Sequence, residues 1–251
     1  VRLLREENEV GGLSVQVFSF LLLAVTPYVA VAIFLAGIAY RLLSWLRVPP
    51  PAVRFLLHPA PKSTLGSLLA VVKQFLFYPS LMSVNPKLWL AAWTGHMALF
   101  GALIGHGRLI TEYTFVFGPL GMDKHAIDQF SFMAGSIAGL IMLAAFTFLL
   151  LRRFRGLLRK LSTPEDYFAL SLVLGLVITG LMMRFATHID VEAMRLYFWE
   201  LATFRPQHLP ENPFFMAHYA LAQLLLAYFP FGKLMHSIGS LLTNSVTRWK
   251  M

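Results

Sequence analysis

The sequence contains no cysteine and has few charged residues. Without cysteine, this chain cannot form disulfides or hold iron–sulfur clusters, and thiolate ligation of haem iron and c-type haem attachment are excluded as well. Only 13% of its 251 residues are charged, whereas a soluble domain carries about a quarter. Because 57% of the residues are hydrophobic, this composition excludes an ordinary soluble globular domain.

Acidic residues are the scarcer charge, with 12 Asp and Glu against 21 Lys and Arg and a net charge of +9. In a soluble protein, such an excess would suggest a nucleic-acid partner. Here most of the basic residues flank apolar runs, so we expect contact with a lipid bilayer and not with nucleic acid.

The apolar residues form runs of about 20 residues or more, which is the length that crosses a bilayer. The sequence therefore predicts an all-α, polytopic membrane protein, with residues 1–251 forming one domain, a five-transmembrane-helix bundle. The spans are expected at about residues 14–45, 86–113, 125–151, 164–184 and 212–243. Residues 63–84 are expected to form a helix at the membrane interface, and residues 190–204 a short amphipathic helix.

Two local signals refine these spans. Residues 162–166 read Ser-Thr-Pro-Glu-Asp, which predicts a helix start with a hydroxyl cap, a proline in the first turn and acids at the positive end of the helix dipole. Pro230 is expected to kink the fifth span.

Loop charge predicts the orientation. From Arg41 to Lys87 there are six Lys or Arg and no acid, and residues 152–160 hold five more basic residues. By the positive-inside rule both loops are cytoplasmic, so the N-terminus lies outside and the C-terminus in the cytoplasm of a multi-pass protein of the cell membrane. The basic runs could serve topology alone, or could also form a docking face for an acidic partner.

Four histidines lie inside apolar spans: His96 and His106 in the second, His218 and His236 in the fifth. Ionisable residues within a membrane indicate function, and four imidazoles on two spans are what two bis-histidine haems need. The two spans are antiparallel, so His106 is expected to face His218 toward the outer side, and His96 to face His236 toward the inner side. At 1.5 Å per residue the pairs are separated by about 15 Å and 27 Å, a mismatch that tilt and the Pro230 kink must absorb.

Glycines surround the two histidines of the second span, at positions 95, 101, 105 and 107. We expect Gly95 and Gly105 in particular to leave room for a flat macrocycle. The alternative is close helix packing, which is the explanation we favour for Gly135 and Gly139 of the third span.

Other functions remain open for the histidines. A single membrane histidine is more often a structural residue or a member of a proton relay than a haem ligand, so a histidine-relay proton channel or transporter is one alternative. A haem-free membrane anchor of a redox complex is another. Zinc is disfavoured because no carboxylate or thiol stands at ligand spacing. The other histidines lie in loops or at span ends: His58, His125, His188 and His208.

Several motifs carry a resemblance to a known family: Pro27-Tyr28-Val29-Ala30, the ten-residue and eighteen-residue histidine spacings, and Phe229-Pro230-Phe231 ahead of Lys233-Leu234-Met235-His236. With these motifs the chain resembles the γ subunit family of respiratory nitrate reductase, a membrane cytochrome b that oxidises quinol. Residues 166–168, 180–185 and 228–236 are similar to the branch found in sulfite-reduction-associated (Dsr-type) and heterodisulfide-reductase-like membrane complexes.

The resemblance implies two haem b groups, one held by His106 and His218 and one by His96 and His236. It also implies a quinone site beside the outer haem, for menaquinol or ubiquinol, and a cytoplasmic iron–sulfur subunit as partner on the basic face. Further membrane and extracytoplasmic subunits would complete such a quinol-dependent oxidoreductase. The terminal acceptor would be reduced on partner subunits, so no catalytic residue is assigned to this chain.

The candidate quinone-site residues are Arg108, Glu112, Lys124, His125 and Asp128. The nitrate-reductase type uses a lysine in the approach to the third span, and here either Lys124 or His125 could take that role. Glu112, His125 or Asp128 could accept protons from quinol. Alternatively, Arg108 and Glu112 only end the second span at the interface.

Overall fold

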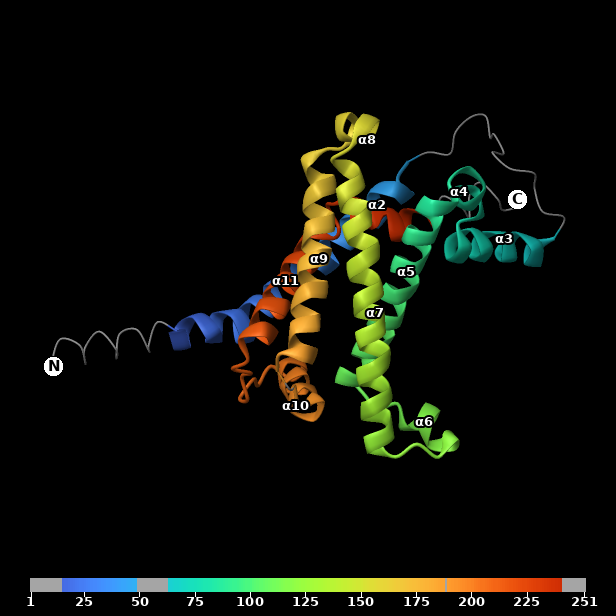
Figure 1. Cartoon of the computed structure of the whole chain (residues 1–251). Coiled ribbons are helices and arrows are strands. Elements are labelled where there is room, and N and C mark those ends of the chain that lie inside the picture. Colours follow the sequence, from blue (N-terminus) through green and yellow to red (C-terminus); the bar gives the residue numbers. More distant parts are fainter. Residues whose placement is uncertain (1–14, 49–62, 188, 241–251) are drawn as a thin grey trace.

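The computed structural model describes residues 15–48, 63–187 and 189–240, and every regular element within them is helical (Figure 1). Four helices are long and apolar enough to cross a membrane: Val15–Leu46, Pro86–Leu109, Lys124–Arg153 and Pro164–Phe185. A further pair, Pro213–Tyr228 and Lys233–Ser240, is bent by 72° and forms a broken fifth span if it is counted as one. The all-helical, multi-pass architecture is thus confirmed, whereas the count of five and the orientation of the termini stay predictions.

Most elements agree with the expected ranges. Their bounds are η1 Leu21–Val25, α2 Thr26–Leu46, α3 Thr64–Phe77, α4 Pro79–Val84, α5 Pro86–His106, η2 Gly107–Leu109, α6 Thr114–Phe117, η3 Gly118–Leu120, α7 Lys124–Arg153, α8 Gly156–Leu161, α9 Pro164–Phe185, α10 Val191–Ala202, α11 Pro213–Tyr228 and η4 Lys233–Met235. The expected interface helix is divided into α3 and α4, and the expected amphipathic helix is α10. His58, His188 and residues 241–243 of the expected last span lie outside the described residues.

The long helices pack in a row, α5 on α7, α7 on α9, α9 on α11 and α11 on α2. Figure 1 shows α7 and α9 side by side at the centre of this row. Their contact contains the main buried cluster, composed of Met142, Phe146, Leu174, Val177 and Leu181. At the end of the row, α5 is covered least by protein, with 6% of its apolar window buried against 28% for each of the other three continuous spans. One side of α5 is therefore available to lipid or to a bound group.

Helix α9 begins with the capping arrangement that the sequence predicts. Thr163 and Asp166 form a capping box, in which the Thr163 backbone N–H donates to Asp166 Oδ2 at 2.9 Å. Pro164 occupies the first turn. This arrangement satisfies backbone groups that would otherwise lack partners at a helix end.

Glycines allow close contact between the helices. A Cβ at Gly139 would lie 2.6 Å from Leu181 Cδ2 of α9, so Gly139 serves helix packing as expected. Gly37 of α2 is more constrained, since its Cβ would lie 2.6 Å from Cβ of Pro230, an atom of a rigid ring. Close approach of α2 to the break after α11 thus requires glycine at position 37.

We expect Gly37→Ala to lower the free energy of unfolding by about 1–3 kcal/mol, the usual cost of overpacking. Gly118→Ala is the matched control, because its Cβ would meet nothing within 4 Å and its φ of −57° suits any residue. Thermal unfolding in detergent, followed by far-ultraviolet circular dichroism, measures both variants. A Gly37→Ala variant with the melting temperature of the wild type would contradict close packing at this position.

Candidate functional site

The structure brings the four span histidines together as two facing pairs. The ring centroids of His96 and His236 are 6.1 Å apart with an interplanar angle of 85°, and those of His106 and His218 are 6.2 Å apart with an angle of 9°. These are the pairs expected from antiparallel helices. The mismatch in spacing disappears because the chain leaves α11 at Tyr228 and bends by 72°, so the eighteen residues from 218 to 236 do not follow one axis.

All four rings have Nδ1 within hydrogen-bonding distance of a backbone carbonyl. The acceptors are Ala92 O for His96 (2.7 Å), Ala102 O for His106 (2.7 Å), Leu176 O for His218 (3.0 Å) and Lys233 O for His236 (2.9 Å). A carbonyl can only accept, so we assign the proton to Nδ1 and leave the Nε2 lone pair free. This is the tautomer that a histidine uses when it binds a metal through Nε2.

The pairs fit haem iron in their spacing. Two imidazoles that bind one iron from opposite sides, through nitrogen atoms at about 2 Å, have their centroids roughly 6 Å apart. A Cβ at Gly105 would meet nothing within 4 Å, which leaves open space beside His106. The residues present thus fit two bis-histidine haems.

Gly95 requires a correction. Its Cβ would lie 3.0 Å from Ala145 Cβ and 3.1 Å from Phe146 Cε1, both on α7. The clearance expected beside His96 is therefore occupied by a neighbouring helix, and Gly95 serves the packing of α5 on α7. Two glycines of one span thus have different surroundings, according to the side of α5 on which each lies.

Sequence reasoning missed several neighbours of the histidines. Tyr78 meets His96 edge-on with centroids 5.8 Å apart, and Thr179 Oγ1 lies 3.0 Å from His218 Nδ1. Tyr78 joins α3 to α4 with a φ of 47°, a left-handed conformation that nothing in the local sequence indicates. Thr179 could have been noticed as a polar residue within an apolar span.

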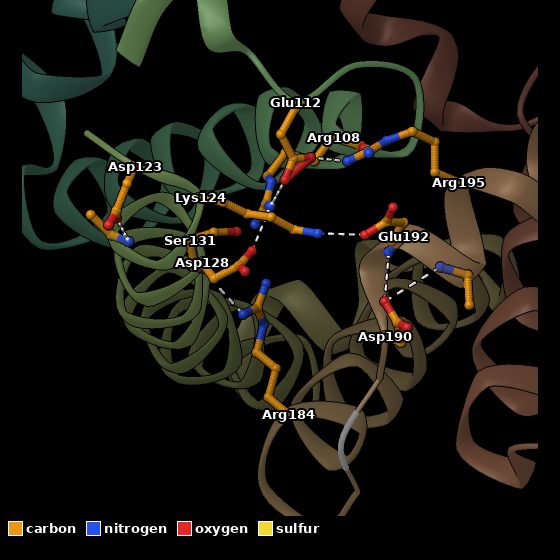
Figure 2. Close-up of polar contacts among 12 residues, drawn as sticks. Arg108, Glu112, Asp123, Lys124, Asp128, Ser131, Arg184, Asp190, Glu192 and Arg195 are labelled. Carbon is orange, nitrogen blue, oxygen red and sulfur yellow. Dashed lines mark hydrogen bonds and ion pairs between the residues drawn. The ribbon is translucent and has the colours of Figure 1, made fainter. Parts of the chain in front are cut away.

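At the other end of α5 from the basic loops, three of the candidate quinone-site residues belong to an ion-pair network, namely Arg108, Glu112 and Asp128 (Figure 2). Arg108 is only 5% exposed, and its Nη2 lies 2.5 Å from Glu112 Oε1 and 2.6 Å from Asp128 Oδ1. Glu112 also pairs with Arg195 of α10. Arg108 and Glu112 therefore join α5, α7 and α10, and do more than end a helix.

The remaining candidates form no direct ion pair with Arg108 or Glu112. Lys124 is exposed and pairs with Glu192 of α10. The exposed ring of His125 has its Nε2 2.9 Å from Gln129 Nε2, one turn along the same helix. The structure thus joins Arg108, Glu112 and Asp128 by ion pairs. Lys124 lies at the edge of this group, where its charge interacts with Asp128, and His125 lies outside it.

Two arginines in or beside the network were not among the sequence-based candidates. Arg184 of α9 donates to Ser131 O at 3.3 Å, and Arg195 Nε donates to Arg108 O at 3.0 Å (Figure 2). Burial, and then the charge of Arg108, lower the pKa of Arg195. An arginine inside an apolar span was a signal for Arg184, whereas Arg195 follows only from the position of α10.

Glu200 at the end of α10 holds the loop that leads to α11. Its carboxylate accepts the backbone N–H groups of His208 (2.9 Å) and Gln207 (2.8 Å), and it pairs with the His208 ring at 2.5 Å. These bonds lower the pKa of Glu200 from 4.5 to about 2, with the backbone bond from His208 as the largest cause.

This lowered pKa predicts a pH dependence. The ionised carboxylate stabilises the fold fully above pH 4.5, its ordinary pKa, and this stabilisation is lost as the pH falls through about 2. We expect Glu200→Gln to have a lower melting temperature than the wild type at neutral pH. The difference between the two melting temperatures should narrow as the pH falls from 4.5 toward 2. Thermal melting of both proteins across this pH range measures the difference. A difference in melting temperature that stays constant with pH would show that the ionised carboxylate does not cause it.

The fold and the two facing histidine pairs define a multi-pass membrane protein with the histidine arrangement of a b-type cytochrome. A family described as "Nitrate reductase gamma subunit" matches residues 78–248. The chain belongs to this nitrate reductase gamma subunit family, as the sequence motifs indicated.

Three relatives support this membership. The "Hdr-like menaquinol oxidoreductase cytochrome b-like subunit" of Archaeoglobus fulgidus is 32% identical over 86% of this chain and 75% of its own length. The subunit with the same description in Archaeoglobus profundus is 27% identical over 85% of this chain and 74% of its own. The "Nitrate reductase gamma chain" of Bacillus subtilis is 29% identical over 56% of this chain and 67% of its own. The chain is thus a membrane subunit of the redox-complex type.

Proposed function

We propose that this chain is the di-haem b membrane subunit of a respiratory quinol-oxidising complex. His106 and His218 would hold one haem, and His96 and His236 the other. The supporting observation is the geometry of the two pairs, with centroids 6.1 and 6.2 Å apart and every Nδ1 held by a carbonyl. Such bonds fix the ring orientation and leave Nε2 as the ligand atom.

The quinol would bind at the end of the bundle that contains Arg108, which the loop charges predict to be the outer side. When bound, the two haems would carry electrons one at a time between this quinol and the inner side. The Glu112 side chain is 19% exposed and that of Asp128 is 46% exposed, and both pair with Arg108. The more buried carboxylate of Glu112 could therefore accept a quinol proton, and the more exposed one of Asp128 could pass protons outward. Menaquinol is the proposed substrate, because the Archaeoglobus relatives are described as menaquinol oxidoreductase subunits.

The direction of this exchange has an energetic consequence. Moving one charge through the membrane potential is worth about 2.3 kcal/mol per 100 mV. Proton release outward together with electron flow inward would therefore contribute to the proton-motive force.

The partner would be a cytoplasmic iron–sulfur subunit on the basic end of the bundle. The exposed cations of this face include Arg155, Arg159 and Lys160, at or beside α8. A chain without cysteine cannot supply an iron–sulfur cluster, so a cluster that receives the electrons would belong to a partner. Further membrane and extracytoplasmic subunits belong to the same proposal.

A dithionite-reduced minus oxidised spectrum of the purified chain, with a pyridine haemochrome count, tests the proposal. We expect two b haems per chain. A folded chain that binds no haem would refute the cytochrome function and leave the relay and anchor alternatives. A relay has less support, since each of the four Nδ1 atoms bonds to a backbone carbonyl and not to another span histidine.

A further inference from the structure

The break in the last span lies directly before His236. Helix α11 ends at Tyr228, and the chain resumes with η4 at Lys233. Irregular backbone at membrane depth is tolerated only where protein or water satisfies its polar groups. The contacts of this break therefore show what holds it, and with it the histidine that follows.

One side of the break is held by α2. Arg41 donates from Nε to Pro230 O at 3.0 Å and from Nη2 to Phe231 O at 3.4 Å. Pro230 is almost fully buried against Gly37 of the same helix. The guanidinium thus occupies two carbonyls that the interrupted helix cannot use.

The other side is held by the first turn of α9. Glu165 Oε1 accepts the Lys233 backbone N–H at 2.8 Å and the Tyr228 hydroxyl at 3.2 Å, so one carboxylate joins both ends of the break. Asp166, which is 7% exposed, lies 2.8 Å from Lys233 Nζ and 3.4 Å from Arg153 Nη1.

Lys233 connects these contacts to the histidine. Its backbone carbonyl accepts the Nδ1–H of His236 at 2.9 Å, while its N–H and its ammonium are bound by Glu165 and Asp166. In contrast, His96 and His106 bond to carbonyls of the preceding turn of their own continuous helix α5. His218 lies in the regular part of α11.

We propose that Glu165 and Asp166 are positioning residues that fix His236 toward His96 through Lys233. This inference rests on the proposed function, because His236 is there a ligand of the inner haem. Groups that orient a ligand contribute to metal affinity although they do not touch the metal. Since His106 and His218 have no contact with the break, the effect is confined to the inner site.

Two single-haem backgrounds separate the sites. His218→Ala leaves only the inner site, and His236→Ala leaves only the outer one. Glu165→Gln, Asp166→Asn and Lys233→Met are introduced into each background, and haem content, midpoint potential and the low-spin electron paramagnetic resonance signal are measured. In the His218→Ala background, which keeps only the inner site, we expect the affinity for haem to fall about tenfold, as for other groups that orient a metal ligand. The haem that remains should have a changed midpoint potential and a changed resonance signal.

In the outer background, the same substitutions should leave content, potential and signal unchanged. Lys73→Met is the matched control, since it removes an exposed cation of α3 that does not contact the break. Lys233→Arg keeps the charge next to Asp166 and should largely restore the inner signal.

Two results would overturn the positioning role while leaving the proposed function intact. One is an inner haem that keeps its content, potential and signal in Glu165→Gln, Asp166→Asn and Lys233→Met alike. The other is an equal loss in both backgrounds, which would show a general contribution to folding. A wild-type chain without haem would instead refute the proposed function and, with it, the role of this contact.

Discussion

His218→Ala is expected to bind one haem b per chain where the wild type binds two. Alanine supplies no ligand, and His106 alone cannot complete a bis-histidine site. The inner pair is ten residues away along α5, about 15 Å, so its ligands are unaffected. His236→Ala should show the reciprocal result and keep the outer haem.

Pyridine haemochrome counts per chain measure this loss, and the spectrum of each variant identifies the haem that remains. His208→Ala is the matched control, because this histidine is exposed and pairs with Glu200 and not with a span histidine. It should retain both haems. Loss of both haems from either single variant, or of none, would contradict two independent sites.

Arg108→Met is expected to lower the free energy of unfolding by about 3 kcal/mol, since removing one partner of a buried ion pair leaves a buried charge without compensation. The side chain of Arg108 is 6% exposed and that of Glu112 is 19% exposed. Arg195 still pairs with Glu112 in the variant, which keeps the expected loss at the lower end of the range for buried pairs. Asp128 contributes less because it is 46% exposed.

Denaturant unfolding in mild detergent measures the effect of Arg108→Met. The control is Arg205→Met, because Arg205 is exposed and its side chain lies outside the network. The double variant Arg108→Met/Glu112→Gln should lose less than the sum of the losses in the two single variants, since each single change already breaks the pair between these residues. If Arg108→Met and Arg205→Met have the same free energy of unfolding, the network does not stabilise this end of the bundle.

The Arg108→Met variant also tests the proposed position of the quinol site. Under conditions in which Arg108→Met remains folded, we expect a menaquinol analogue to reduce the bound haem more slowly than in the wild type. Glu200→Gln, which alters the far end of α10, should reduce at the wild-type rate. Equal rates in Arg108→Met and the wild type would place quinol binding elsewhere.

Much of the architecture follows from local sequence. The capping residues Thr163 and Asp166 lie within one turn of each other, so the start of α9 could be predicted. Proline at position 230 predicted an interruption of the last span, and the chain leaves α11 there. The pairing of histidines between spans two and five followed from their order along two antiparallel helices, without knowledge of any contact.

The functional environment of those histidines could not be predicted in the same way. Arg195 reaches Glu112 across 83 residues, and Lys233 reaches Glu165 across 68. Gly95 and Gly105 are identical in type and ten residues apart, yet one contacts α7 and the other faces open space. Helix ends and apolar periods depend on hydrogen bonds and side chains within a few residues, which the sequence alone determines. Partners across the bundle depend on how whole helices pack, and only the tertiary structure decides which of them meet.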